Sequence, residues 1–110
     1  MMVQMLYSKI RFATVTKSSF KYKGSIGIDE DIMDELGILE NQVVNVNGMG
    51  GEIRTETYVI PEERGSRAVV VRGALANYLY KGDICHINVY VMMDYETAKT
   101  HKPIIIEKNK

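Results

Sequence analysis

Residues 24–37 read GSIGIDEDIMDELG, and this stretch joins a short strand directly to a short helix. The residues from Ser25 to Ile28 favour a strand. Asp29 is of a type that caps helix N-termini, and the acids that follow lie where the helix dipole favours negative charge. Gly37 can adopt the left-handed conformation that ends a helix. We therefore predict a helix from Asp29 to Gly37, with an apolar stripe made of Ile32, Met33 and Leu36.

Outward from this stretch, most of the chain has the pattern of short strands separated by turns. The predicted strands are 7–16, 25–28, 42–47, 54–60, 68–71 and 83–92. Glycine-rich or polar turn sequences separate them at 48–51, 63–66 and 81–83, and Pro61 fits a strand end. A second short helix is predicted over 73–79. Many short strands without a strand–helix–strand rhythm predict a mainly β protein, a β-barrel with two short helices.

The length and composition predict one globular domain, residues 1–110. The chain has 110 residues, of which 45% are apolar, and this suits one core of ordinary size. No run approaches the roughly 20 apolar residues that span a bilayer. The N-terminal residues reach Lys9 and Arg11 too soon for a signal peptide, and a lone Cys85 suits a reducing compartment. We expect a cytoplasmic protein without a membrane contact.

Charge is balanced overall but is distributed unevenly. Fourteen basic and fourteen acidic side chains cancel, so nothing in the charge predicts a nucleic-acid partner. Residues 1–24 contain five bases and no acid, whereas residues 29–40 contain six acids and no base. The simpler interpretation is two solvated faces. The alternative is that opposite charges help to hold two parts of the chain together.

Several residue types that often perform chemistry have an ordinary structural explanation here. His86 and His101 are isolated from any second ligand, so no metal site is predicted. The glycines of 48–51 lack the Lys and Ser/Thr of a phosphate-binding loop, and a turn is the better interpretation. Cys85 has no adjacent base and is predicted to be a small buried apolar residue.

Four segments together resemble the aspartate 1-decarboxylase family in order and spacing. They are 5–10 (MLYSKI), 22–31 (YKGSIGIDED), Arg54 with Thr57-Tyr58, and 63–66 (ERGS), and residues 37–41 (GILEN) add a fifth match. The resemblance implies a double-psi β-barrel and a homotetramer with sites between subunits. It also implies a pyruvoyl group made from a serine of the chain, with neither a metal nor pyridoxal phosphate, and an acidic amino-acid substrate.

The Gly24-Ser25 peptide bond is the predicted source of that group. A serine hydroxyl can attack the preceding carbonyl and convert the amide to an ester, provided that the carbonyl is exposed in a strained backbone, and glycine permits such geometry. β-Elimination would then release a chain that ends at Gly24, and hydrolysis would leave a pyruvoyl group at residue 25. The expected products are 1–24 and 25–110. Taken alone, the dipeptide would be interpreted as a turn before a strand.

The resemblance also assigns roles to residues that would otherwise be unremarkable. Thr57 holds the carbonyl that Ser25 attacks and contacts substrate, and Tyr58 supplies the proton after carbon dioxide leaves. Arg54 and Lys9 bind carboxylate, one as a planar fork and the other as a point charge. Gly73, Ala74 and Leu75 match the segment that offers backbone contacts to substrate.

The chain departs from the family pattern at three of these lining positions. The family usually has histidine where this chain has Arg11 and asparagine where it has Arg72, and Leu75 is bulkier than the usual alanine. Arg11 and Arg72 are therefore possible modifiers of the pocket. The leading prediction is decarboxylation of aspartate to β-alanine for pantothenate synthesis. The alternatives are a paralogue that acts on glutamate or a substituted aspartate, and an uncleaved, non-catalytic barrel.

Overall fold

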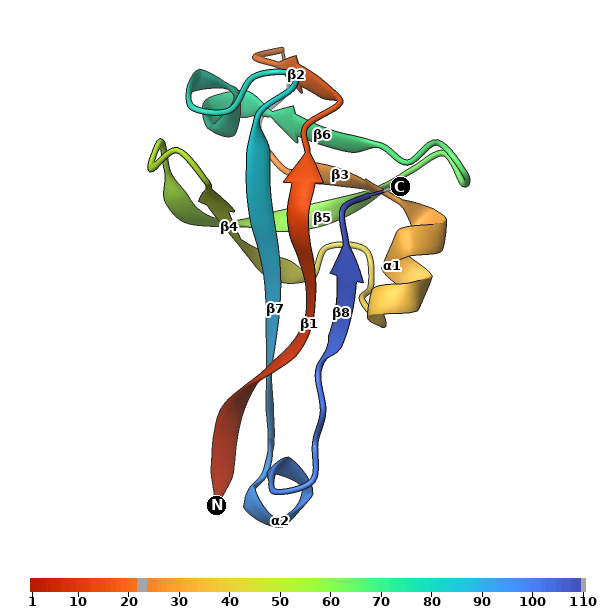
Figure 1. The fold of residues 1–110 in the computed structure, drawn as a ribbon, viewed down its shortest axis with the longest axis vertical. Coiled ribbons are helices and arrows are strands. Elements are labelled where there is room, and N and C mark those ends of the chain that lie inside the picture. Colours follow the sequence, from red (N-terminus) through yellow and green to blue (C-terminus); the bar gives the residue numbers. More distant parts are fainter. Residues whose placement is uncertain (22–23, 110) are drawn as a thin grey trace.

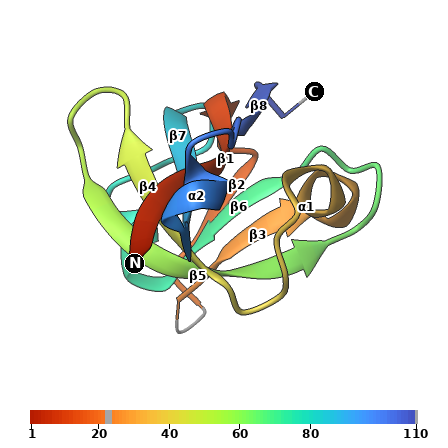
Figure 2. The same cartoon turned by 90° about the horizontal axis from the view of Figure 1, so that it is seen from below.

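Eight strands form one curled mixed sheet in the computed structural model, which describes residues 1–21 and 24–109 (Figure 1). The strands are β1 (Met2–Thr14), β2 (Lys17–Ser19), β3 (Ile26–Asp29), β4 (Val43–Gly48), β5 (Arg54–Glu62), β6 (Val69–Arg72), β7 (Ile84–Asp94) and β8 (Ile104–Glu107). Their order in the sheet is β2-β6-β3-β5-β4-β7-β1-β8. The view from below shows the strands wrapped around a common interior (Figure 2). The prediction of a mainly β protein is confirmed.

The longest element is the antiparallel pair of β1 and β7. It runs from Met2 opposite Asp94 to Thr14 opposite Ile84, with irregularities after Leu6 and after Ile10. One end extends beyond the rest of the sheet, and helix α2 (Tyr95–Ala98) lies at its tip (Figure 1). Strand β1 begins five residues before the predicted start at Tyr7 because pairing with β7, rather than residue preference, defines it.

The strand-to-helix transition around Asp29 agrees with the prediction. Helix α1 (Glu30–Leu36) begins directly after β3, and the Asp29 carboxylate accepts a hydrogen bond of 2.9 Å from the backbone N–H of Asp31. Gly37 closes the helix at φ 70°. The three predicted apolar residues, Ile32, Met33 and Leu36, are buried against the sheet.

The second predicted helix is shorter and tighter than expected. It is the 3₁₀-helix η1 (Gly73–Asn77), which begins at Gly73 with φ 65°. Two short strands, β2 and β8, and helix α2 were not predicted. Strands β2 and β8 both pair in parallel with a distant strand, β6 and β1, so no local sequence pattern reports them.

Pro61 lies inside β5 rather than at its end, which corrects the predicted boundary at Ile60. The ladder between β5 and β4 ends at Tyr58, whereas the parallel ladder with β3 runs from Val59 to Glu62. Pro61 thus lies where β5 has a single strand neighbour, and a missing N–H is tolerated at such a position.

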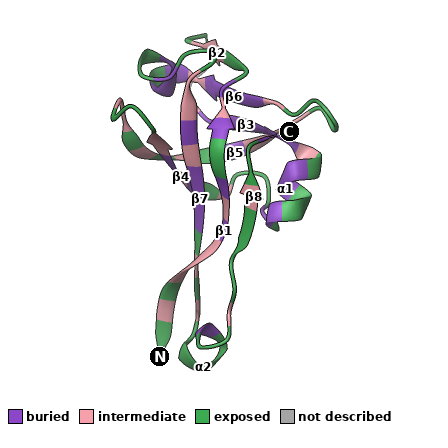
Figure 3. Ribbon diagram, in the orientation of Figure 1, coloured by how far each residue is buried: buried purple, intermediate pink, exposed green. Residues whose placement is uncertain are grey.

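The core fills the concave side of the sheet. Buried apolar side chains come from the central strands, α1 and η1, as the purple segments of Figure 3 show. Cys85 is among them and is fully buried, as predicted. Burial raises the pKa of its thiol to about 12, and the carboxylates of Glu52 and Asp83 add to this effect. The thiol is therefore protonated and inert at neutral pH.

The acids of α1 are paired within their own part of the chain. The Arg64 guanidinium contacts Asp31 and Asp34 at 2.8 Å each and Glu30 at 3.2 Å. Among the described residues, their ion-pair partner is Arg64 and not a base of residues 1–21, which favours the interpretation of solvated faces. Within the same described ranges, no helix is long and apolar enough to cross a membrane.

We predict that Asp29→Ala lowers the free energy of unfolding by about 2–4 kcal/mol, because the buried carboxylate also accepts the N–H groups of Gly65 (3.1 Å) and Arg67 (2.8 Å). Urea unfolding at pH 7 measures the change. The matched control Asp31→Ala removes an exposed acid and should lose less than about 1 kcal/mol. Equal losses in the two variants would contradict the role given to Asp29.

This loss should depend on pH in one direction. Burial alone raises the pKa of Asp29, but the backbone hydrogen bonds from Arg67, Asp31 and Gly65 outweigh it and hold the pKa below the ordinary value of 3.8. The contribution of the carboxylate is therefore complete above pH 3.8 and is lost as the pH falls through the lower native pKa. The difference between wild type and Asp29→Ala should shrink in that acidic range.

Candidate active site

The backbone at Gly24-Ser25 has a conformation that L-residues rarely adopt. Gly24 has φ 149° and Ser25 has φ 101°. For a serine such a value is strained by roughly 1–3 kcal/mol, and surrounding structure must maintain it. Ser25 is 2% exposed and directly precedes β3, and its carbonyl oxygen accepts a hydrogen bond of 3.2 Å from the backbone N–H of Arg72. The predicted strain at this bond is therefore present in the described structure.

A hollow of about 290 Å³ lies beside this bond. It brings together five of the residues predicted from the sequence: Gly24, Thr57, Arg72, Ala74 and Leu75. Ile53, Thr55, Glu56 and Tyr78 complete its lining. The ends of β5 and β6, the start of η1 and the residue before Ser25 thus meet at one place.

Three other predicted residues, Lys9, Arg54 and Tyr58, lie on the outer face of the sheet, which is the face opposite to Thr57. Exposure alternates along β5, so that Thr57 is half-buried whereas Arg54 and Tyr58 are exposed. Lys9 of β1 is opposite Asn88 of β7. Asn88 in turn is opposite Asn45 of β4, which is opposite Glu56 of β5, so these side chains form one row on the outer face. Among the described residues, the lining of the hollow includes neither Lys9, Arg54 nor Tyr58.

This outer face combines polar groups with exposed apolar side chains, which the sequence analysis did not anticipate. The Asn88 side chain is 5% exposed, and its Oδ1 atom has no hydrogen-bond partner in the described ranges. Large apolar residues of neighbouring strands on this face are between 41% and 57% exposed: Val43, Tyr58, Tyr90, Met92 and Ile105. A polar group that is buried but unpaired next to exposed apolar area is typical of a surface that another molecule covers.

His86 belongs to the same outer face and is neutral at pH 7. Its Nδ1 atom accepts a hydrogen bond of 3.1 Å from the backbone N–H of Phe12. Burial, together with the charges of Lys9 and Arg11, lowers the pKa of His86. This arrangement agrees with an ordinary strand histidine, and no group of three or more potential metal ligands occurs within the described residues.

The two unusual arginines have different surroundings. Arg11 is exposed and forms an ion pair with Glu107, away from the hollow. Arg72 lines the hollow and also contacts Glu62, with 2.7 Å between Nη2 and Oε2. Arg72 thus lines the hollow, as expected of a pocket modifier, and at the same time forms an ion pair with an acid of the same chain.

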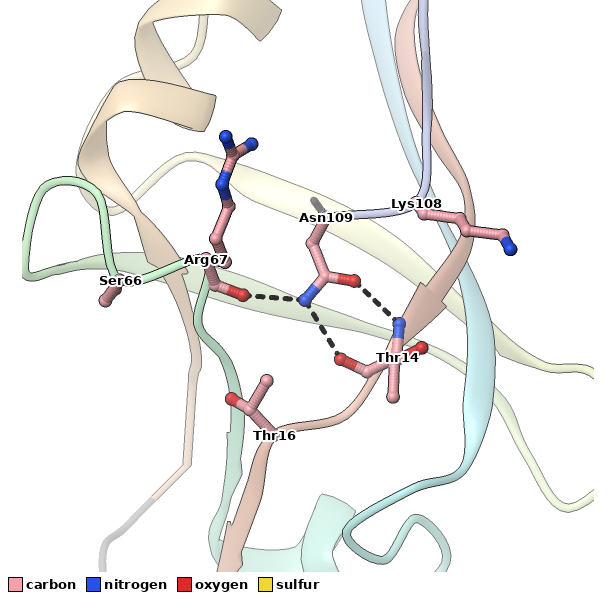
Figure 4. A pocket seen from close by; sticks show the side chains of 6 residues that line it. All are labelled: Thr14, Thr16, Ser66, Arg67, Lys108 and Asn109. Atoms are coloured by element: carbon pink, nitrogen blue, oxygen red, sulfur yellow. Dashed lines mark hydrogen bonds between the residues drawn. The ribbon is translucent and has the colours of Figure 1, made fainter.

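A second hollow of about 470 Å³ is larger, and structural hydrogen bonds join several of the residues that line it (Figure 4). Its lining residues are Thr14, Thr16, Ser66, Arg67, Lys108 and Asn109. The Asn109 side chain accepts from the backbone N–H of Thr14 (2.8 Å) and donates to the backbone oxygens of Thr14 (3.1 Å) and Arg67 (2.7 Å). Because these polar groups satisfy one another, the smaller hollow beside Ser25 is the candidate active site.

A family model and the sequences of known relatives match this chain over nearly all of its length. The family model described as aspartate decarboxylase matches residues 1–110. A protein of Parabacteroides distasonis named aspartate 1-decarboxylase is 45% identical, over 96% of this chain and 91% of that protein. A protein of the same name from Acetivibrio thermocellus is 43% identical, over 100% of this chain and 90% of that protein. The computationally designed msDPBB_sym2 protein matches in structure with a TM-score of 0.42 and 19% identity, over 79% of this chain and 96% of that one.

Proposed function

Because the chain belongs to the aspartate decarboxylase family, we propose that it is a cytoplasmic, pyruvoyl-dependent aspartate 1-decarboxylase. It converts aspartate to β-alanine and carbon dioxide, and β-alanine serves pantothenate and coenzyme A synthesis. The observation that carries this proposal is the strained backbone at Gly24-Ser25 beside a hollow lined by Thr57.

In the proposed maturation, the single domain 1–110 cuts itself into 1–24 and 25–110. The Oγ atom of Ser25 attacks the carbonyl carbon of Gly24, and the amide becomes an ester as the nitrogen takes up a proton. Loss of the Cα hydrogen of residue 25 then breaks the Cβ–O bond and releases Gly24 as a carboxylate. One water adds and one ammonia leaves, and a ketone remains at residue 25.

The surroundings of Ser25 fit this chemistry. The positive φ of Ser25 strains the backbone of the intact chain. Cleavage relieves this strain and is therefore favoured. Thr57 lies in the hollow that Gly24 lines and can donate its hydroxyl to the carbonyl under attack. When formed, a pyruvoyl group here supplies an electrophilic carbonyl that condenses with the substrate amine and accepts electrons as carbon dioxide leaves.

The other residues of the proposed site bind substrate and return a proton. Arg54 offers a planar pair of N–H donors to a carboxylate, and Lys9 offers a compact positive charge. Tyr58 supplies the proton to the carbon that has lost carbon dioxide. Ala74 and Leu75 line the hollow, and backbone groups at the start of η1, from Gly73 onward, can contact substrate.

The proposed site needs both groups of residues. The hollow of one chain is lined by Thr57, but its lining in the described residues does not include Lys9, Arg54 or Tyr58, which lie on the outer face of the sheet. We infer that the outer face of one subunit covers the hollow of its neighbour. The exposed apolar side chains of that face support this inference. A homotetramer is the assembly that the resemblance to the family implies.

We predict that Ser25→Ala remains folded but is neither cleaved nor active, because only the attacking hydroxyl is lost. Intact-mass measurement of the purified wild type should give two chains whose masses sum to the intact chain plus one water minus one ammonia. Ser25→Cys should cut slowly, since a thiol can also attack. An uncut wild type, or normal cleavage of Ser25→Ala, would disprove the maturation model.

Tyr58→Phe should mature normally and decarboxylate ~10²–10⁴-fold more slowly, because the phenol donates its proton only after carbon dioxide has left. Cleavage is read by mass, and turnover by the appearance of β-alanine. Tyr90→Phe is the matched control, since it removes a similar exposed phenol from the same face. Wild-type turnover by Tyr58→Phe would remove Tyr58 from the mechanism.

Two inactive variants should restore activity when they share one assembly. Ser25→Ala lacks the reactive group and Arg54→Ala lacks a carboxylate ligand, but a mixed assembly contains interfaces at which both are intact. Co-expression with two different tags should yield mixed oligomers with measurable aspartate turnover, whereas each variant alone stays inactive. Mixed oligomers without turnover would contradict a site shared between subunits.

A further inference from the structure

The ion pair between Glu62 and Arg72 crosses over the central strand β3. Glu62 belongs to β5 and Arg72 to β6, and these strands flank β3 on its two sides. The Nη2–Oε2 distance is 2.7 Å, and the two side chains are only 20% and 15% exposed. Glu62 Oε2 has no aligned hydrogen-bond donor in the described part of the chain, so the contact is chiefly one of opposite charges.

Gly27 provides the space through which this pair passes. A Cβ atom at residue 27 would lie 1.9 Å from Oε2 of Glu62 and 2.7 Å from Nη1 of Arg72. Real Cβ atoms essentially never approach other atoms so closely, so any larger residue would displace one or both side chains. Gly27, Glu62 and Arg72 therefore form a unit in which each member depends on the others.

This unit adjoins the proposed reactive residue. The backbone N–H of Arg72 contacts the carbonyl oxygen of Ser25 at 3.2 Å, and its side chain lines the hollow together with Gly24 and Thr57. An arginine without a counter-charge at this place would be a strong additional site for anions. With Glu62 beside it, the guanidinium keeps its N–H donors, but its charge is largely offset.

We propose that Glu62 is a positioning residue that holds the guanidinium of Arg72 over Gly27, at the hollow, and offsets its charge. Arg72 then acts as a fixed hydrogen-bond donor in the hollow and not as a third cation that binds substrate carboxylates. Arg54 and Lys9 bind the carboxylates. This inference rests on the proposed function. With the charge of Arg72 offset, the hollow suits aspartate, and no additional acidic group on the substrate is needed to balance this arginine.

The first test separates the two effects of Glu62 in the mature enzyme. In Glu62→Gln, the Arg72 side chain should move toward bound carboxylate and away from its position over Gly27. The kcat for aspartate should fall about tenfold, while succinate, a dicarboxylate without an amine, should inhibit several-fold more tightly. A purely structural ion pair would lower the urea midpoint and leave both constants unchanged.

Two further variants control this test. Glu63→Gln removes the neighbouring exposed acid and should change neither constant. Adding Arg72→Asn to Glu62→Gln should return succinate inhibition to the wild-type value, because the cation whose charge Glu62 had offset is then absent. Unchanged or weaker succinate inhibition in Glu62→Gln would overturn the proposal.

The second test uses the dependence on Gly27 and does not require that Glu62→Gln be well folded. Gly27→Ala alone should slow cleavage and lower kcat, because its Cβ atom clashes with the pair and the clash shifts strand β3 next to residue 25. The triple variant Gly27→Ala/Glu62→Ala/Arg72→Asn removes the clash and should regain cleavage, measured by intact mass. If the triple variant were cleaved as slowly as Gly27→Ala, the proposed dependence among Gly27, Glu62 and Arg72 would be wrong. A wild type that neither cleaves nor decarboxylates would instead overturn the proposed function itself, and this inference with it.

Discussion

Strand β3 is hydrogen-bonded on both of its edges, in parallel to β5 and antiparallel to β6, and both ladders begin at Ile26. The residue before Ile26 therefore cannot relax without breaking strand pairing in the middle of the sheet. This constraint holds Ser25 at φ 101°, a value that an isolated serine would leave. The capping of α1 by Asp29 and the ion pair over Gly27 depend on the same strand. Strand pairing, the helix cap and the ion pair therefore all fix β3, the strand that follows the strained bond.

The segment before the proposed cut is bound to the remainder mainly by backbone pairing. Strand β1 pairs along its length with β7, and β2 pairs with β6. The Asn109 side chain adds a clamp between Thr14 and Arg67 (Figure 4). The uneven charge of the two segments contributes less, since the acids of α1 contact Arg64 of their own segment. A cleaved chain would thus keep its sheet intact, because no ladder crosses the cut bond itself.

The arrangement of charge explains how a third cation can be present in a small site. Arg72 is offset by Glu62 within the same subunit, whereas Lys9 and Arg54 lie on the outer face, where a neighbouring hollow can use them. In the proposed site, the hollow beside Ser25 comes from one subunit and the residues that bind substrate come from its neighbour. The exposed apolar side chains of the outer face favour the assembly that this proposal requires.

The sequence alone determined the local features, because these depend on neighbouring residues. The cap at Asp29, the stop at Gly37, the central strands and the strain-prone Gly24-Ser25 bond were all readable, and motif spacing indicated the family. Only the tertiary structure decided which residues meet. The parallel strands β2 and β8, the clearance at Gly27 and the Glu62–Arg72 pair arise between segments far apart in the chain. The side of the sheet on which Arg54 and Thr57 lie also follows from strand pairing and curvature, which no short sequence pattern encodes.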